Sequence, residues 1–386
     1  MESNEIIETN EGITINNFKA TGIKEEKYGV ALIWNENLCE TAAVFTKNSI
    51  KANPVILDIK KIRNKKDKKF RAIIINSGNA NACVDGMKDA EEMCKIASEK
   101  FKEINLNINE DEILVASTGI IGKKLDIEKI RNIVKKLNLN DSDSKKAAMA
   151  IMTTDKKIKE ISLEYKGIKI GGIEKGAGMI SPNMATMLCF LTTNADFDNK
   201  ILQKCLTEAV ENSFNKITVD GCMSTNDTVI LLSDRTKKCN IDDFKFLLNF
   251  ATLELAKKIV KDGEGATKFI EILVKGAKTR KKAINIARAI ANSNLVKTAF
   301  FGENLNWGRI VSAAGSVGKI NFEKISLKIE DIDTKEEVEI LEKGILKIDK
   351  EKNKIMKGKN LKIVLNLNEG NEEATIYTCD LSFEYV

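Results

Sequence analysis

Two spacings of apolar residues alternate along the chain, one typical of β-strands and the other of α-helices. Short runs rich in β-branched residues predict strands, whereas longer segments with apolar residues three or four positions apart predict helices. The predicted strands span residues 30–34, 42–46, 71–76, 113–118, 187–192, 228–232 and 267–274. The predicted helices span residues 87–104, 126–137, 198–215, 241–260 and 280–292, with Asp126 as an N-cap. This alternation predicts an α/β fold with mixed sheets and packed helices.

Glycines gather in the segment 161–195, which departs from the alternation. A hairpin-like pair of strands around Lys166-Gly167 is followed by Gly171, Gly172, Gly176 and Gly178, and then by Ser181-Pro182-Asn183. Pro182 is one of only two prolines in the chain. This composition predicts a loop of unusual backbone geometry that leads directly into the strand at 187–192.

Charged residues give the last part of the chain a different character. From 320 to 375 the sequence is rich in Lys and Glu that alternate with Ile and Leu, as on exposed strands. We expect a charged, partly β accessory region there. With 386 residues, the whole chain is long enough for two domains or two large lobes, on a prior of about 150 residues each.

The amino-acid composition excludes several classes of chemistry. The chain contains no histidine, so it has no Ser-His-Asp or Cys-His site and no His-ligated zinc. None of the eight cysteines forms a C-x-x-C pair, so we expect no zinc framework, no thioredoxin-like motif and no metal. Most of these cysteines are expected to be small buried residues in a reducing compartment.

Charge and hydropathy limit the partners that we expect. The net charge of +6 is spread over a chain in which acids and bases are mixed, so a nucleic-acid partner is disfavoured. The Lys-rich stretch 60–69 could contact phosphates, but a solvated helix face or loop is the favoured interpretation. The N-terminus is polar, and no window approaches the run of about 18 apolar residues that a membrane span needs. We therefore expect a cytoplasmic protein without a membrane partner.

A chain without imidazole needs another base if it performs acyl transfer near neutral pH. One solution is a Thr or Ser whose base is its own free α-amine, with a pKa of about 7.7–8.0. Such an amine arises inside a sequence only if the chain is cut there. The segment Met184-Ala185-Thr186-Met187-Leu188 fits this requirement, because a glycine-rich loop and the small Ala185 precede a Thr that opens a predicted strand.

Several ordered motifs resemble those of one known family. The segment KGAGMISPNMATMLCF (175–190) resembles the signature of the ornithine acetyltransferase family, the self-cleaving glutamate N-acetyltransferases of arginine biosynthesis. The likeness covers nearly the whole chain. Further similar elements are 43–46 with Pro54 close behind, IINSGNANACVDG (74–86), ASTGIIG (116–122), AIMTTD (150–155), ITVDGCMSTNDT (217–228), DGEGATK (262–268), LVKTAFFGENLNWGRI (295–310) and CDLSFEYV (379–386).

The resemblance implies a fold, a processing step and a reaction. The fold is the N-terminal-nucleophile type shared by the ornithine acetyltransferases and DmpA, and cleavage between Ala185 and Thr186 gives an α chain (1–185) and a β chain (186–386). Thr186 then takes acetyl from N2-acetyl-L-ornithine and passes it to L-glutamate by a ping-pong mechanism. An N-terminal-nucleophile amidohydrolase or aminopeptidase that uses the same Thr186 is the alternative, and a non-enzymatic basic binding protein comes third.

The resemblance also implies the residues around the nucleophile. Thr118 and Gly119 match the oxyanion-hole positions, where a hydroxyl and an approachable backbone N–H stabilise the tetrahedral oxyanion. Thr153 (favoured over Thr154), Lys175 and Glu264 match substrate-binding positions, with Lys175 suited to a carboxylate and Glu264 to an ammonium. By contrast, Asp85, Asp220 and Asn226 are interpreted first as structural loop residues.

The remaining expectations concern cofactors, assembly and the end of the chain. No cofactor is expected, although acetyl-CoA is a possible second acetyl donor. The α and β fragments are expected to stay associated, with two of each in the assembly. Family members usually continue past the Tyr-Val element to an Asn and a terminal Ser or Thr that contact substrate, whereas this sequence stops at Val386. Either the sequence is truncated or this part of the pocket is built differently.

Overall fold

The computed structural model describes residues 6–181, 187–347 and 350–385, with the backbone alone for 350–352. It divides into two compact units, each described by itself. The first unit comprises residues 1–215 and 222–259, and the second comprises residues 216–221 and 260–386. The predicted cleavage point at 185/186 therefore falls inside the first unit and does not separate the two.

Most of the described helices and strands belong to the first unit. Its strands are β1 (Ile7–Glu8), β2 (Lys19–Glu25), β3 (Tyr28–Phe45), β4 (Lys69–Asn79), β5 (Ile113–Ile120), β6 (Lys159–Tyr165), β7 (Ile168–Lys175), β8 (Leu188–Ala195) and β9 (Thr228–Lys237). Its helices are α1 (Asn53–Asn64), α2 (Met87–Phe101), α3 (Ile127–Lys136), α4 (Ser144–Ile151), α5 (Asn199–Asn212) and α6 (Ile241–Lys261), the last of which runs across the boundary between the units.

The sheet of the first unit folds back on itself at β3. Its strand order is β1-β6-β7-β8-β9-β3-β4-β5, with β2 paired to β3. Residues 29–34 of β3 pair with β4 and residues 40–45 pair with β9, with a register shift between Trp34 and Cys39. Apolar side chains from both halves, among them Ile33, Ile73 and Phe190, pack in one cluster. The strand β3 therefore turns the corner between two facing layers of strands.

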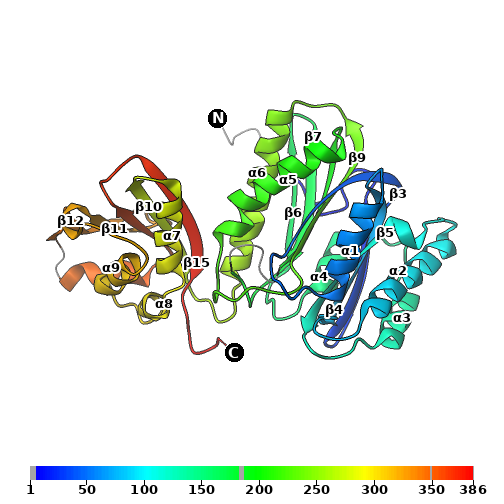
Figure 1. Cartoon of the computed structure of the whole chain (residues 1–386), viewed down its shortest axis with the longest axis horizontal. Coiled ribbons are helices and arrows are strands. Elements are labelled where there is room, and N and C mark those ends of the chain that lie inside the picture. Colours follow the sequence, from blue (N-terminus) through cyan, green and yellow to red (C-terminus); the bar gives the residue numbers. More distant parts are fainter. Residues whose placement is uncertain (1–5, 182–186, 348–349, 386) are drawn as a thin grey trace. The chain divides into compact units, whose positions relative to one another are not determined.

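Helices cover the outer faces of these layers. Helices α2 and α3 pack against one layer through a cluster that includes Trp34, Met93 and Ile130. On the other layer, α6 comes so close to β7 that a Cβ on Gly172 would lie 3.4 Å from Leu255 Cδ1. Figure 1 shows α1, α2 and α3 beside β4 and β5, with α5 and α6 beside β6–β9. The predicted α/β class with mixed sheets and packed helices is confirmed.

Most of the predicted elements are present, with two instructive differences. The strands predicted at 30–34 and 42–46 are parts of the single strand β3. The Lys-rich stretch 60–69 begins as the end of α1, where Pro54 occupies the first turn, and continues into β4. Asp126 caps α3 as predicted, because its side chain accepts a hydrogen bond from Lys129 N.

The glycine-rich loop is shorter than the sequence predicted. Gly171 and Gly172 lie within β7, so the prediction that all four glycines form a loop was wrong for these two. Their lack of a side chain serves close packing, because a Cβ on Gly171 would lie 2.2 Å from Gly12 O. The irregular backbone starts at Gly176 and includes Met179, whose φ of 57° lies in the left-handed region.

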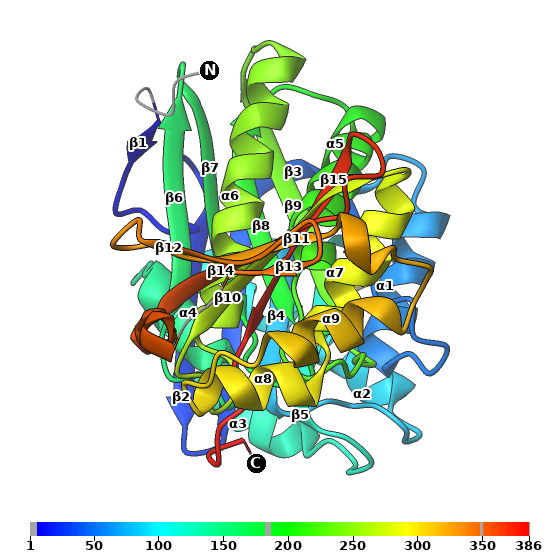
Figure 2. The ribbon, with the colours of Figure 1, turned by 90° about the vertical axis from the view of Figure 1, so that its left-hand side faces the viewer.

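In its described residues, the second unit has a six-stranded sheet and three α-helices that begin within it. Its strands are β10 (Phe269–Ala277), β11 (Ser326–Asp331), β12 (Glu337–Glu342), β13 (Ile345–Leu346), β14 (Asn360–Asn366) and β15 (Glu372–Cys379), in the order β13-β12-β11-β14-β10-β15. Its helices are α7 (Arg280–Ala291), α8 (Asn294–Phe301) and α9 (Trp307–Gly315). Figure 2 shows these strands running together beside α7, α8 and α9.

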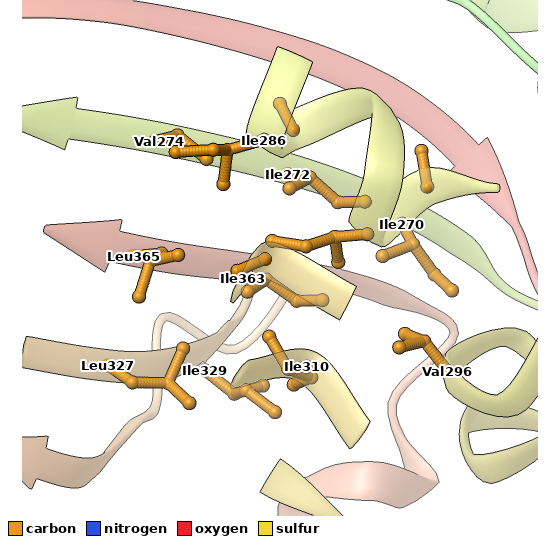
Figure 3. Packing of buried hydrophobic residues seen from close by; sticks show 14 of the residues in the cluster. Ile270, Ile272, Val274, Ile286, Val296, Ile310, Leu327, Ile329, Ile363 and Leu365 are labelled. Atoms are coloured by element: carbon orange, nitrogen blue, oxygen red, sulfur yellow. The ribbon is translucent and has the colours of Figure 1, made fainter. Parts of the chain in front are cut away.

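The stretch 320–375 is an integral part of this second sheet. Its strands β11 and β14 pair with each other, and β14 also pairs with β10. Figure 3 shows Leu327, Ile329, Ile363 and Leu365 from these strands packed with Ile286, Val296 and Ile310 from the helices. The alternate Lys and Glu positions leave the other strand face polar, which is the charged, partly β character that the sequence indicates.

Two further findings concern the chemistry of the chain. All eight cysteines are free thiols, and five of them are buried. Within residues 6–181, 187–347 and 350–385, the structure contains no helix with the length and apolar content of a membrane span.

Candidate functional site

The predicted nucleophile lies just before β8. Thr186, Ala185 and Pro182 fall outside the described residues, so the site is built from the residues that flank them. Met187 is buried, and both its backbone N–H and its carbonyl form hydrogen bonds at the start of β9. Its backbone N–H donates to Asp227 Oδ1 at 3.1 Å, and its carbonyl accepts from Thr228 N at 3.2 Å. The chain that follows Thr186 is thus held in the sheet from its first described residue.

The predicted oxyanion pair lies at the carboxyl end of β5. Thr118 is in register with Ser77 of β4, and Gly119 with Gly78. Gly119 has a φ of 130°, and a Cβ at this position would lie 2.3 Å from the carbonyl carbon of Gly78. Only glycine fits there, for two independent reasons. Thr118 is buried whereas Gly119 is exposed. The end of the strand therefore has the exposed backbone of Gly119 next to the buried residue Thr118.

Asn226 joins this strand end to the start of β9. Its Nδ2 donates to Ala80 O at 2.7 Å and to Ser117 O at 2.8 Å. A second link is the hydroxyl of Thr46, at the end of β3, which donates to Ser224 O at 2.8 Å. These contacts agree with the interpretation of Asn226 as a structural residue. They also bring Ser117, which precedes Thr118, and Asn226, which precedes Asp227, to one end of the unit.

Buried charges of both signs lie at the same end. The carboxylate of Asp155 accepts from Lys159 Nζ at 2.7 Å and lies 4.0 Å from Lys175 Nζ. It also accepts from the backbone N–H groups of Thr153 at 3.0 Å and Gly176 at 2.7 Å. Asp155 therefore connects the half-buried Thr153 to the buried Lys175, two residues predicted to bind substrate.

The charge state of Asp155 follows from these neighbours. Burial alone would raise the pKa of its carboxyl group, but the ammonium groups of Lys175 and Lys159, together with the hydrogen bonds from Lys159 and Thr153 N, hold this pKa well below its usual range. Asp155 is therefore a carboxylate at neutral pH and offsets the positive charge of Lys175.

Lys24 is a further cation of the site. Its Nζ donates to Ser77 Oγ at 2.8 Å and to Met152 O. Burial and the nearby Lys175 lower its pKa, while Asp155 partly restores it. Sequence reasoning missed Lys24, Asp155 and Lys159. Asp155 ends the Met-Thr-Thr-Asp element, and Lys159 follows four residues later, so these two had a local signal that Lys24 on β2 lacked.

Two buried carboxyl groups adjoin the site. Asp227 precedes β9 and bonds to Met187 N. Glu174 precedes Lys175 but points to the opposite face of β7, because successive side chains of a strand alternate. Burial raises the pKa of Glu174 to about 8. Among the described residues, neither oxygen of Glu174 has a hydrogen-bond partner.

Glu264 belongs to the second unit. It is half-buried between Gly263 and Gly265, and Gly265 has a φ of 67°. The C-terminal segment packs on this turn, because Ser382 Oγ donates to Gly265 O at 2.6 Å. The structure thus brings Thr118, Gly119, Thr153 and Lys175 together in the first unit. It describes Glu264 only within the second.

Other candidate sites are weaker. A surface cavity of about 580 Å³ lies between α1 and α2, but it contains none of the predicted residues and its charged groups are mostly surface side chains. In the described part of the chain, no group of three or more Cys, Asp or Glu residues could hold a metal ion.

The fold and the site together are those of an α/β protein with buried charges of both signs at one end of a sheet, as in an enzyme site. The comparisons with known proteins identify the family. The family model described as "ArgJ family" matches residues 16–386. The chain therefore belongs to the ArgJ family, and the resemblance seen in its motifs is confirmed.

Individual relatives match along nearly their whole length. A protein of Methanocaldococcus jannaschii named "Glutamate N-acetyltransferase" is 48% identical, covering 96% of this chain and 95% of its own. A protein of Caldanaerobacter subterraneus subsp. tengcongensis named "Arginine biosynthesis bifunctional protein ArgJ" is 42% identical, covering 95% and 93%. The crystal structure of the arginine biosynthesis bifunctional protein from Bacillus halodurans is 35% identical, with a TM-score of 0.47, covering 51% of this chain and 95% of that one.

Proposed function

We propose that this chain is a glutamate N-acetyltransferase of arginine biosynthesis that moves acetyl from N2-acetyl-L-ornithine to L-glutamate. The products are L-ornithine and N-acetyl-L-glutamate. Membership of the ArgJ family and the names of its relatives support this activity. The proposed nucleophile is Thr186, which acts after the chain has cut itself between Ala185 and Thr186.

One structural observation carries the proposal. The carboxyl end of β5, with Thr118 and Gly119, is bonded through Asn226 to the loop that holds Met187. Met187, which directly follows the proposed nucleophile in the sequence, therefore lies at the same end of the unit as the proposed oxyanion residues Thr118 and Gly119, and this supports the proposal. Buried Lys175 supplies positive charge at this place.

Self-cleavage begins with attack of the Thr186 hydroxyl on the Ala185 carbonyl carbon. The peptide C–N bond breaks as the acyl group moves from nitrogen to oxygen, and water then hydrolyses the ester. The products are a free carboxylate on Ala185 and a free α-amine on Thr186. That amine supplies the base that a chain without histidine lacks.

The transfer reaction uses the same hydroxyl a second time. Thr186 Oγ1 attacks the acetyl carbonyl of N-acetylornithine, and the Thr118 hydroxyl and the Gly119 N–H stabilise the oxyanion. Ornithine leaves, and the amine of glutamate then attacks the acetyl ester. Lys175 pairs with a substrate carboxylate, Thr153 supplies a hydroxyl, and Glu264 holds a substrate ammonium.

The fragments stay together because the cut lies between two paired strands. Strand β7 precedes the cut and pairs antiparallel with β8, from Ile170 with Thr193 to Lys175 with Leu188. Strand β8 also pairs with β9, so it is held on both sides. We expect an assembly with two α and two β fragments.

Denaturing electrophoresis with N-terminal sequencing tests the processing step. The wild-type protein should give fragments 1–185 and 186–386, the second of which begins with Thr186. Thr186→Ala should remain uncut and inactive, whereas Thr186→Ser keeps a hydroxyl and should still cleave. An intact wild-type chain that transfers acetyl would refute the mechanism.

An assay with and without acceptor tests the reaction. Ornithine release from N-acetylornithine should require glutamate and should yield N-acetylglutamate in equal amount. Release that ignores glutamate would instead identify an amidohydrolase acting through the same Thr186. Incubation of glutamate with acetyl-CoA in place of N-acetylornithine then decides whether the enzyme has a second acetyl donor.

A further inference from the structure

Lys24 lies where β2 meets two elements of the candidate site. Its Nζ donates a hydrogen bond to Ser77 Oγ at 2.8 Å, and Ser77 is paired in register with Thr118. The same Nζ donates to the carbonyl of Met152, the residue directly before Thr153. The two bonds therefore hold this ammonium group between the strand of the proposed oxyanion residue and the segment of a proposed substrate residue.

The ammonium group of Lys24 is fixed in position and still has a donor to offer. Ser77 Oγ donates to Ala150 O at 2.7 Å, so the hydroxyl that accepts from Lys24 is itself held in place. Among the described residues, Ser77 and Met152 are the ones that accept hydrogen bonds from Lys24. An ammonium group has three N–H donors. The third donor of this half-buried lysine is therefore left for an acceptor from outside the chain.

The described side chains around Lys24 carry more positive than negative charge. The carboxylate of Asp155 pairs with Lys159 at 2.7 Å and lies 4.0 Å from Lys175 Nζ. The charges of Lys175 and Asp155 both act on Lys24. Glu174 adjoins Lys159, but burial raises its pKa to about 8, so its neutral form prevails at pH 7. Three ammonium groups thus surround the carboxylate of Asp155, which favours the binding of a further anion.

A carboxylate ligand would relieve the repulsion between Lys24 and Lys175. Burial and the charge of Lys175 lower the pKa of Lys24, whereas Asp155 raises it. The ordinary pKa of a lysine, about 10.4, lies well above neutral pH. A bound carboxylate acts in the same direction as Asp155, because an opposite charge favours the ionised form. The cluster is therefore suited to an anionic ligand in particular.

The proposed reaction presents the site with two side chains of opposite charge. That of N-acetylornithine ends in an ammonium, whereas that of glutamate ends in a carboxylate. Lys175 is proposed for a carboxylate and Glu264 for the ammonium, which leaves the second carboxylate of glutamate without a partner. We infer that Lys24 is a specificity-determining residue that binds the side-chain carboxylate of glutamate, the acetyl acceptor. The inference rests on the proposed function, because it names a partner for the acceptor of that reaction.

The Lys24→Met variant tests the inference, because it keeps an apolar stem and removes the charge. Glutamine is the probe beside glutamate, since its neutral amide has nearly the shape of the carboxylate. The wild type should prefer glutamate to glutamine by about 10-fold or more in kcat/KM, and the variant should lose most of this preference. Its kcat/KM for N-acetylornithine should stay close to the wild-type value, because a ping-pong reaction separates the two half-reactions.

Further variants control for the loss of charge and for folding. Lys24→Arg keeps a positive charge and should retain the preference for glutamate. Lys19→Met removes a lysine from the same strand, where Lys19 forms a 2.8 Å ion pair with Glu36, and should behave as the wild type. If Lys24→Met does not fold, Lys24→Gln replaces it in the same comparison, because its amide keeps a donor for Ser77 or Met152.

The outcomes that contradict the inference differ from those that contradict the proposed function. Equal losses with glutamate and glutamine would show a structural role for Lys24 and overturn the inference. An equal loss with N-acetylornithine would also overturn it, since both substrates share the α-carboxylate. The same holds for a wild type that does not distinguish the two acceptors, and for a matching loss in Lys19→Met. A wild type that transfers acetyl to neither acceptor would refute the proposed function instead.

Discussion

Asp155 and Lys159 form an ion pair of 2.7 Å in which both side chains are almost completely buried. The same carboxylate accepts hydrogen bonds from Thr153 N and Gly176 N, so the pair anchors the chain on both sides of the β6–β7 hairpin. A buried ion pair contributes little net stability by itself, but removal of one partner leaves a charge in a medium of low dielectric constant. The pair therefore makes the site sensitive to changes at Asp155.

Asp155→Ala should destabilise the protein by about 3–5 kcal/mol, because Lys159 and Lys175 lose the carboxylate that both approach. Asp155→Asn keeps an acceptor for the backbone N–H groups and should cost less. Urea unfolding at pH 7 measures both. The pKa of Asp155 is held below its ordinary value, so its stabilising effect is complete above about pH 3.9 and is lost as the pH falls further. A wild-type protein that shows no greater acid sensitivity than Asp155→Asn would contradict this account.

Glu174→Gln should stabilise the protein in mildly alkaline solution. Burial raises the pKa of Glu174 to about 8, above its unfolded value, so the folded state favours the protonated form. The wild-type protein therefore loses stability as the pH rises from about 4.5 to about 8, by up to about 1.4 kcal/mol per pH unit. The variant lacks this loss. Thermal unfolding at pH 5 and pH 8 should show similar midpoints at pH 5 and a higher midpoint for the variant at pH 8.

Gly119→Ala should impair both stability and transfer. The φ of 130° disfavours any side chain, and the new Cβ would meet the carbonyl carbon of Gly78 at 2.3 Å. Gly122→Ala is the matched control, because Gly122 also has a positive φ, of 78°, but a Cβ added there would have no neighbouring atom within 4 Å. We expect a loss of about 1–2 kcal/mol for Gly122→Ala from backbone strain alone. For Gly119→Ala we expect a larger loss and a transfer rate lower by about 100-fold or more. Equal effects of the two substitutions would argue against a special role for the strand end.

Asn226→Ala should lower kcat with little effect on KM. The amide of Asn226 bonds to the carbonyls of Ala80 and Ser117, and Ser117 directly precedes Thr118. Its loss leaves buried carbonyl groups without this donor, at about 1–3 kcal/mol each, and lets the end of β5, which carries the proposed oxyanion residue Thr118, shift. Thr225→Val should give a milder version, because Thr225 Oγ1 only orients the amide through a 2.6 Å hydrogen bond to Asn226 Oδ1. Steady-state kinetics with N-acetylornithine and urea unfolding separate the two effects, and a change confined to KM would exclude the proposed role.

The period of the apolar residues was enough to predict the α/β class, but not where the sheet bends. The polar residues Asn35, Glu36 and Asn37 interrupt the apolar pattern and suggest the end of a strand. In the structure this stretch is the corner of β3, where the strand leaves one layer and enters the other. A local pattern cannot distinguish a strand end from a corner, since the difference depends on partners that are distant in sequence.

The residues of the candidate site also divide into those that the sequence could predict and those that only the fold brings together. Thr118, Gly119 and Lys175 could be proposed because they lie in motifs that resemble the family. Lys24 could not, because its partners Ser77 and Met152 are 53 and 128 residues away. Asp227 lies inside a quoted motif, but its importance follows from burial and from its bond to Met187, which only the fold creates.

The antiparallel pairing of β7 with β8 has a consequence for how the enzyme would behave in dilute solution after the proposed cleavage. Each of these strands also pairs with a second neighbour, β6 and β9 respectively. If the chain is cut between Ala185 and Thr186 as proposed, the two polypeptides could therefore separate only if the sheet of the first unit came apart. Within one α–β pair, activity should be independent of protein concentration, and mixing with separately expressed fragments should not exchange them without denaturant.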